Sequence, residues 1–249
     1  MESALIEFKD IKKSFGTNHV LKGINLTITK GLITAIIGKS GTGKSVLLKH
    51  IIGLIEPDSG QLLFEGQPID TISRRQKRKF QRELSYMFQD NALFDFMNIY
   101  DNIALPLVEA PQRGGQPDIP VREKVFQRMA QLGLEGIGEK FPQQLSGGMR
   151  KRVALARALV TDPKVVLFDE PTTGLDPVRK QNVHSMIQEY QEQFGFTAVI
   201  VSHDIPEIFD VAQKIAMLDE GLIIFEGTRD DLQSSDNDKL NRFIRGMEA

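Results

Sequence analysis

The chain has 249 residues, of which 41% are hydrophobic and 26% are charged, so it can bury a sizeable core. Its 31 basic and 33 acidic residues give a formal net charge of −2, which excludes a whole-molecule field that attracts nucleic acid or an anionic membrane. The absence of cysteine excludes disulfides and thiolate metal sites. No apolar stretch approaches the roughly 18 residues that span a bilayer, and no signal-peptide layout opens the chain, so we expect a cytoplasmic location.

Two strand patterns follow in chain order. The first thirty residues contain two segments that alternate apolar and polar positions, Leu5–Lys9 and Leu21–Ile28, which predicts half-exposed antiparallel strands in a side sheet. Continuous apolar runs predict strands that are covered on both faces, at Ile33–Ile37, Val165–Phe168, Ala198–Val201 and Ile215–Leu218. Because helical patterns separate these runs, we predict an α/β fold with a mostly parallel central sheet.

The middle of the chain is mostly helical. Between Gln89 and Val160 the turn-rich stretch Pro111–Pro117 interrupts the helical pattern, which predicts an exposed loop within a helical subdomain of about residues 90–160. Before it, Arg74–Arg82 is a basic run of the kind that usually forms a solvated helix face, so we expect no nucleic-acid partner. We predict one domain over residues 1–249, with a short helix in Asn241–Ala249.

A phosphate-binding loop of the pattern G-x-x-x-x-G-K-[ST] follows the strand Ile33–Ile37 and precedes an apolar helix predicted over Val46–Leu54. In such a loop, glycines let consecutive N–H groups turn toward one anion, and the helix presents its positive end. We predict that Lys44 reaches the β- and γ-phosphates of a nucleotide and that the Ser45 hydroxyl joins a Mg²⁺ shell. The nucleotide-binding residues predicted here are Gly38, Lys39, Ser40, Gly41, Thr42, Gly43, Lys44, Ser45 and Val46.

Two consecutive acids, Asp169 and Glu170, end the strand Val165–Phe168. Adjacent strand residues point to opposite faces, so we predict different roles for the two carboxylates. Asp169 holds Mg²⁺, and Glu170 deprotonates the water that attacks the γ-phosphate. In the alternative, the acids only cap the solvated end of a strand. The catalytic interpretation is favoured because ligands in open α/β sheets bind at the carboxyl ends of strands.

Ser146, Gly147 and Gly148 precede another predicted helix. A hydroxyl, unobstructed N–H groups and a helix N-terminus can cap a terminal phosphate. Taken alone, the tripeptide is equally well a helix cap. Its position between the phosphate-binding loop and Asp169 favours the phosphate-binding interpretation.

In their order and spacing, these motifs resemble the nucleotide-binding domain of ABC transporters over nearly the whole chain. Four further positions match that family: Phe15, Gln89 after Leu84–Phe88, Asp176 in Gly174–Asp176, and His203 after Thr197–Ser202. The resemblance implies that adenine stacks on Phe15 and that His203 contacts the γ-phosphate. It also implies that Gln89 meets Mg²⁺ and senses a membrane subunit, and that Asp176 couples the two sites of a dimer.

Each of these four residues also has a structural interpretation. Phe15 could pack on the side sheet, and His203 and Gln89 could be ordinary polar residues at strand ends. Asp176 before Pro177 is a common helix cap.

Within the family, the chain is similar to the ATPase of Mla-type transporters in Gly38–Lys49, Met87–Phe94, Met97–Ile103 and Ser146–Arg152. Transporters of that group move phospholipids or other hydrophobic molecules with MCE-domain proteins in diderm envelopes. Val46 and Met149 replace the threonine and glutamine of the common cassette pattern, as they do in the Mla-like group. Val46 lacks a hydroxyl that could meet the α-phosphate.

The resemblance implies an ATPase that uses ATP and Mg²⁺ at the cytoplasmic face of the inner membrane. It implies a homodimer in which each ATP lies between Lys44 of one chain and Ser146 of the other. Permease subunits, with an MCE-domain protein, would dock near residues 89–102, where Phe94, Phe96 and Met97 offer apolar contacts. The alternatives are a cassette that regulates cell-wall enzymes without cargo and an importer ATPase for another small solute. A soluble cassette of translation or DNA repair is disfavoured, because the chain has neither a second cassette nor a long coiled coil.

Overall fold

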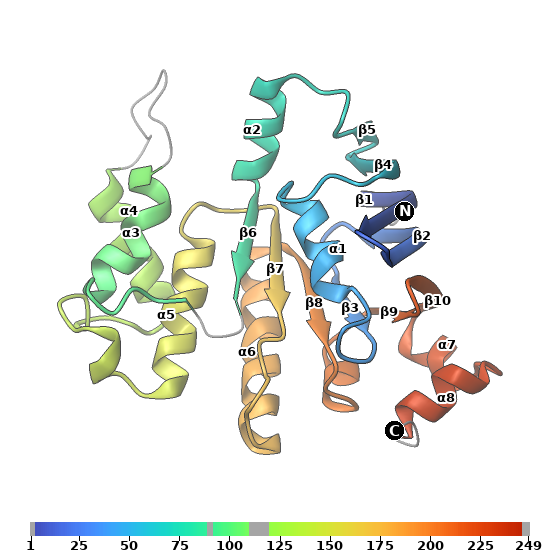
Figure 1. The fold of residues 1–249 in the computed structure, drawn as a ribbon. Coiled ribbons are helices and arrows are strands. Elements are labelled where there is room, and N and C mark those ends of the chain that lie inside the picture. The colour runs from blue at the N-terminus through green and yellow to red at the C-terminus, as the bar shows by residue number, and fades with distance from the viewer. Residues whose placement is uncertain (1–2, 89–91, 110–119, 246–249) are drawn as a thin grey trace.

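The computed structural model describes residues 3–88, 92–109 and 120–245. Two β-sheets lie side by side, with the antiparallel strands on one side of the parallel strands and a group of helices on the other (Figure 1). Within those ranges, none of the helices combines the length and the apolar composition that a bilayer crossing requires.

The antiparallel sheet comes from the early part of the chain and has the strand order β2-β1-β4-β5. Its strands are β1 (Ala4–Phe15), β2 (Asn18–Thr29), β4 (Ser59–Phe64) and β5 (Gln67–Pro68). Ile6, Phe8 and Leu26 are buried, whereas Lys9 and Lys22 are exposed. The alternation predicted for a side sheet is therefore confirmed.

The central sheet has the strand order β10-β9-β3-β8-β7-β6. Its strands are β3 (Ile33–Ile37), β6 (Leu84–Met87), β7 (Val165–Asp169), β8 (Thr197–Ser202), β9 (Lys214–Asp219) and β10 (Leu222–Gly227). All pairings are parallel except that of β10 with β9 at the edge. Ile36 and its same-face neighbours pack against the side sheet and α1, while Ile37 and the opposite face pack against α5 and α6. Cover on both faces explains the continuous apolar runs.

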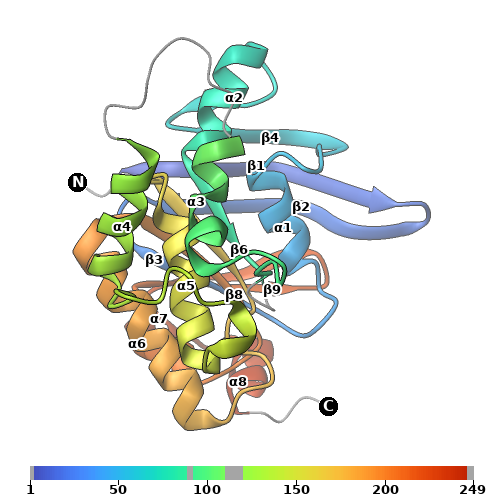
Figure 2. The same cartoon turned by 90° about the vertical axis from the view of Figure 1, so that its left-hand side faces the viewer.

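The helices of the described ranges include three that pack on one another. The bounds are α1 (Lys44–Ile51), α2 (Arg74–Arg82), α3 (Ile99–Glu109), α4 (Val121–Gln131), α5 (Gly147–Leu159), α6 (Pro177–Phe194), α7 (Arg229–Gln233) and α8 (Asp238–Ile244), with 3-10 turns η1 (Pro142–Gln144) and η2 (Glu207–Asp210). Helices α3, α4 and α5 pack on one another in the stretch predicted to be helical, and they face the viewer in Figure 2. The predicted loop Pro111–Pro117 lies outside the described residues.

Two helix boundaries and one edge strand differ from the sequence prediction. Helix α1 ends at Ile51 instead of continuing to Leu54, because Gly53 has φ 71 and closes the helix. The N–H groups of Gly53 and Leu54 donate to the carbonyl oxygens of His50 and Lys49, which is the Schellman pattern. Helix α8 begins earlier than predicted, where Asn237 accepts a hydrogen bond from the N–H of Leu240. The antiparallel edge strand β10 was not predicted.

Candidate active site

Glycines shape the loop between β3 and α1. Gly38 has φ 154 and Gly43 has φ 105. A Cβ atom at Gly43 would lie 2.8 Å from Cγ1 of Val20, so a larger residue fits there neither in conformation nor in space. The hydroxyl of Thr42 donates to the carbonyl oxygen of Lys39 at 2.9 Å, which further fixes the turn.

Lys44, the first residue of α1, is almost completely buried. Its Nζ donates to the carbonyl oxygens of Gly38 and Lys39, both at 2.8 Å, and lies 3.9 Å from Oε1 of Glu170. Burial lowers the pKa of Lys44, and the negative charges of Glu170 and Asp169 act in the opposite direction. The ammonium group therefore lies between the loop and both acids, where it can bind an anion.

Asp169, at the end of β7, contacts two other elements of the site. Its Oδ1 accepts a hydrogen bond from the hydroxyl of Ser45 at 2.9 Å, and its Oδ2 accepts one from the hydroxyl of Tyr86 at 2.6 Å. Burial, together with the bond to Asp169, raises the pKa of Tyr86, so the phenol stays protonated.

The adjacent oxygens of Ser45 and Asp169 suit a hard divalent cation. Among the residues that the structure describes, no group of three or more His, Cys, Asp or Glu could hold a metal ion. A cation held by Ser45 and Asp169 would thus take further oxygen ligands from phosphate or water.

Glu170 lies one residue beyond the end of β7 and contacts other partners than Asp169 does. Its Oε2 lies 2.8 Å from Nδ1 of His203 and accepts a hydrogen bond from the hydroxyl of Thr173 at 2.7 Å. The backbone of Glu170 has φ 50, a left-handed conformation that costs a non-glycine residue about 1–3 kcal/mol. The carboxylate is thus held beside His203 at some conformational cost.

One cavity of about 560 Å³ brings most of the predicted site residues together. Half of the Phe15 surface is exposed at its edge, so the ring is not packed into the core of the side sheet. The predicted residues that line this cavity are Phe15, Ser40, Gly41, Gly43, Lys44, Ser45, Val46, Asp169, Glu170 and His203.

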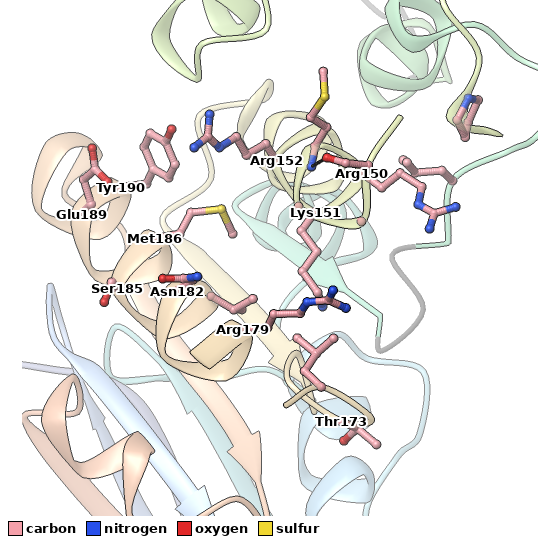
Figure 3. A pocket seen from close by; sticks show the side chains of 18 of the residues that line it. Arg150, Lys151, Arg152, Thr173, Arg179, Asn182, Ser185, Met186, Glu189 and Tyr190 are labelled. Atoms are coloured by element: carbon pink, nitrogen blue, oxygen red, sulfur yellow. Dashed lines mark hydrogen bonds between the residues drawn. The ribbon is translucent and has the colours of Figure 1, made fainter. Parts of the chain in front are cut away.

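The Ser146 loop lines a different, larger hollow of about 1040 Å³ between α5 and α6 (Figure 3). The Ser146 hydroxyl accepts a hydrogen bond from the N–H of Met149, so it caps α5. Asp176 likewise caps α6, by accepting from the N–H of Arg179. Thr173 lines both cavities, which therefore adjoin each other. Within one chain, Ser146, Gly147, Gly148 and Asp176 stay outside the group around Lys44.

Two residues of the site were not predicted from the sequence, and one prediction lies beyond the described ranges. Tyr86 reaches Asp169 because β6 pairs with β7, a relationship that no local pattern signals. Thr173 is only three residues beyond Glu170, so its contact could have been anticipated. Gln89 is not among the described residues.

The family of the chain follows from a comparison of this arrangement with known proteins. Residues 21–173, more than half of the chain, match the protein family described as ABC transporter. The chain belongs to the ABC transporter family. It is an ABC-type ATPase domain, as the resemblance implied.

Curated relatives carry two descriptions. The intermembrane phospholipid transport system ATP-binding protein MlaF of Escherichia coli is 37% identical over 98% of this chain and 89% of its own length. The probable ribonucleotide transport ATP-binding protein mkl of Mycobacterium tuberculosis is 39% identical over 97% of this chain. The chain spans 66% of the length of that mycobacterial relative. The predicted similarity to the Mla group is confirmed by MlaF.

Solved structures confirm the predicted fold. The cassette is similar to cbiO1 from Clostridium perfringens, part of the ABC transporter complex cbiONQ, with a TM-score of 0.84 and 32% identity over 100% of both chains. A dimeric ATP-binding cassette in a post-hydrolysis state, bound to ADP and Pi, is 29% identical with a TM-score of 0.74. That match covers 90% of this chain and 98% of the other.

Proposed function

We propose that this cassette hydrolyses ATP as a homodimer and thereby drives a membrane transporter whose cargo is phospholipid or another hydrophobic molecule. The observation that carries the proposal is the convergence of Lys44, Asp169, Glu170 and His203 in one cavity with Phe15 at its edge. Each of these side chains offers a contact that ATP hydrolysis needs.

ATP would bind with its adenine on the half-exposed ring of Phe15 and its phosphates on the loop Gly38–Gly43 and Lys44. Glu170 accepts a proton from water as the water oxygen bonds to the γ-phosphorus. The bond between that phosphorus and the oxygen of ADP breaks, which releases ADP and phosphate. His203, 2.8 Å from Glu170, contacts the γ-phosphate.

The oxygens of Ser45 and Asp169 would hold Mg²⁺, which would neutralise charge on the β- and γ-phosphates. The family resemblance adds Gln89, which lies outside the described residues, as a further ligand. The hydroxyl of Tyr86 holds Asp169 in the orientation that this binding requires. Through Mg²⁺, Ser45 and Asp169 would therefore orient the phosphates of the nucleotide relative to Glu170.

The dimer is supported by the exposed positions of Ser146, Gly147 and Gly148, outside the cavity that contains Lys44. These residues offer a hydroxyl and a helix N-terminus, which suit a phosphate that another chain presents. A head-to-tail dimer would bring Ser146 of one chain to the γ-phosphate bound at Lys44 of the other, with Asp176 beside it. A similar cassette is dimeric in its solved structure.

Membrane subunits are supported by an exposed apolar surface. Phe94 and Phe96 are 40% and 76% exposed, with ring centroids 5.5 Å apart. We assign this surface to permease subunits at the cytoplasmic face of the inner membrane, with an MCE-domain protein in the complex. The lipid cargo is supported by the similarity to MlaF, whereas the similarity to mkl favours ribonucleotide as a second candidate.

The proposal is tested by hydrolysis and by co-purification. Glu170→Gln keeps size and hydrogen bonding but removes the proton acceptor, so turnover is expected to fall by about 10²–10⁴ while ATP binding is retained. Glu192→Gln makes the same chemical change at an exposed position of α6 that lines neither cavity, and this variant should hydrolyse normally. Wild-type turnover in Glu170→Gln would show that Glu170 is not the base.

Co-purification from detergent-solubilised membranes tests the partners and the cargo. We expect permease and MCE-domain proteins in the complex, and ATP-dependent lipid transfer between vesicles after reconstitution. Ribonucleotide uptake without lipid transfer would favour the second candidate. Recovery of cell-wall enzymes without any transport would instead identify a regulatory cassette.

A further inference from the structure

Asp204 is a buried acid, one residue after His203, whose two carboxylate oxygens are both engaged. Oδ1 accepts a hydrogen bond from Nζ of Lys180 at 2.5 Å, and Oδ2 accepts one from the hydroxyl of Thr172 at 2.7 Å. Asp204 is only 8% exposed, and Thr172 is fully buried. Burial favours the neutral acid, but the bonds from Lys180 and Thr172 outweigh it and hold the pKa of Asp204 below its usual value.

The three residues come from segments that also carry residues of the site. Thr172 follows Glu170 in the loop after β7, and Asp204 follows His203 after β8. Strands β7 and β8 are neighbours in the sheet, and Lys180 approaches from the first turns of α6. The cluster therefore fixes the backbone on both sides of the contact between Glu170 and His203.

Asp204 makes no hydrogen bond to the ring of His203, so a link between the two residues would run through the backbone. Its Oδ1 lies 3.9 Å from Nε2 of His203, which is longer than a hydrogen bond. The N–H of Asp204 donates to the hydroxyl of Ser202 at 2.9 Å, so the chain is held at both neighbours of His203. The His203 side chain is 41% exposed, and its Nδ1 contacts Oε2 of Glu170 at 2.8 Å. The direction of the ring therefore depends on that contact and on the position of the His203 backbone.

A buried ion pair adds little net stability, because desolvation of both charges offsets their attraction. A contribution to the stability of the fold therefore does not explain why Lys180 and Asp204 form an ion pair beside His203. We propose that Asp204 is a positioning residue for His203 and that Lys180 and Thr172 hold it in place. This inference rests on the proposed role of His203 in ATP hydrolysis.

The test is a double-mutant cycle of Asp204 with His203. Asp204→Asn keeps the size of the side chain but removes its charge and one of its acceptor oxygens. The kcat of hydrolysis is expected to fall by about 10-fold to 100-fold, because a misplaced group loses that much rate. The KM for ATP should stay within about twofold, since Phe15 and Lys44 are untouched. In a His203→Ala background, Asp204→Asn should cause no further loss of kcat.

Two further variants separate the positioning of His203 from a general loss of stability. Thr172→Val removes one donor to Asp204 with little change of shape, and it takes the place of Asp204→Asn if that variant does not fold. Gln191→Leu is the control on α6, because its buried side chain donates to the carbonyl oxygens of Gly31 and Phe196. Gln191→Leu should lower Tm. It should change kcat by the same factor in the wild-type and the His203→Ala backgrounds.

An equal loss of kcat from Asp204→Asn in the wild-type and His203→Ala backgrounds would overturn the inference. Asp204 would then be structural, and the proposed ATPase function would stand. A wild-type chain that does not hydrolyse ATP would overturn the proposed function and this inference with it.

Discussion

The hydroxyl of Tyr86 donates a hydrogen bond to Oδ2 of Asp169 at 2.6 Å, while the other carboxylate oxygen accepts from Ser45. Tyr86→Phe removes only this donor. We expect the free energy of unfolding to fall by about 1–2 kcal/mol, since a bond to a charged group is lost at a partly exposed position. The Mg²⁺ concentration for half-maximal hydrolysis should rise about 10-fold, because residues that orient a metal ligand affect affinity to that degree.

A magnesium titration of hydrolysis, with urea unfolding measured alongside, checks this prediction. Tyr100→Phe makes the same chemical change on α3 in the helical region and serves as the control. A Tyr86→Phe variant with the magnesium dependence of Tyr100→Phe would show that the phenol does not orient Asp169 for metal binding.

The sequence predicts the sheets and the phosphate-binding loop because local physics decides them. The apolar run Ile33–Ile37 can be satisfied only by cover on both faces, and every residue of β3 is buried. The end of α1 was predicted wrongly, because the apolar pattern continues to Leu54 although Gly53 closes the helix. Leu54 is 70% exposed, and nothing in the periodicity distinguishes it from a buried residue.

The candidate site was predictable where its residues end parallel strands, since those ends share one edge of the sheet. Lys44, Asp169 and His203 meet for that reason. The contact of Tyr86 with Asp169 depends on which strand neighbours β7, and the cluster around Asp204 depends on how α6 approaches β8. Such long-range pairings leave no local trace in the sequence.

Phe15→Ala tests the base-stacking role. Stacking on an aromatic side chain contributes about 1–3 kcal/mol per base, so the affinity for ATP should fall at least several-fold. Phe126→Ala is a matched control, because Phe126 is 47% exposed against 48% for Phe15 and lies on α4. Titration of both variants with ATP measures the difference. An unchanged affinity for ATP in Phe15→Ala would show that Phe15 does not stack on adenine and has only a structural role on the side sheet.

His184 makes stability depend on pH. Within the described part of the chain, neither buried ring nitrogen of His184 has a hydrogen-bond partner. Burial lowers its pKa below 6.5, and Lys180 acts with burial, whereas Asp204, Glu207 and Asp210 act against it. As the pH falls below 6.5, the unfolded chain therefore takes up a proton that the folded chain does not bind.

The free energy of unfolding should consequently decrease by up to about 1.4 kcal/mol per pH unit for this histidine. Urea unfolding between about pH 7.5 and pH 5.5 measures the slope. His184→Leu should flatten it, and His50→Leu should do so as well, because burial also lowers the pKa of His50. An identical slope in His184→Leu and wild type would contradict the prediction.

The composite site can be tested by crosslinking, since the chain has no cysteine of its own. Ser40 and Ser146 are both exposed, one in the loop before α1 and the other at the start of α5. In a head-to-tail dimer, Ser40→Cys of one chain should approach Ser146→Cys of the other. Adding Glu170→Gln prevents the loss of ATP during the experiment. The control pair combines Ser40→Cys with Ser234→Cys, whose second thiol lies at the end of α7.

A short bifunctional thiol reagent should give covalent dimer from the Ser40→Cys/Ser146→Cys pair with ATP and Mg²⁺, and much less with ADP. The physical reason is that the γ-phosphate supplies the anion that the N-terminus of α5 binds across the interface. The control pair should give little dimer in any nucleotide state. If the yield of covalent dimer from the test pair does not depend on the nucleotide, or equals that of the control pair, the proposed shared site is wrong. Ser146 is then only the cap of α5.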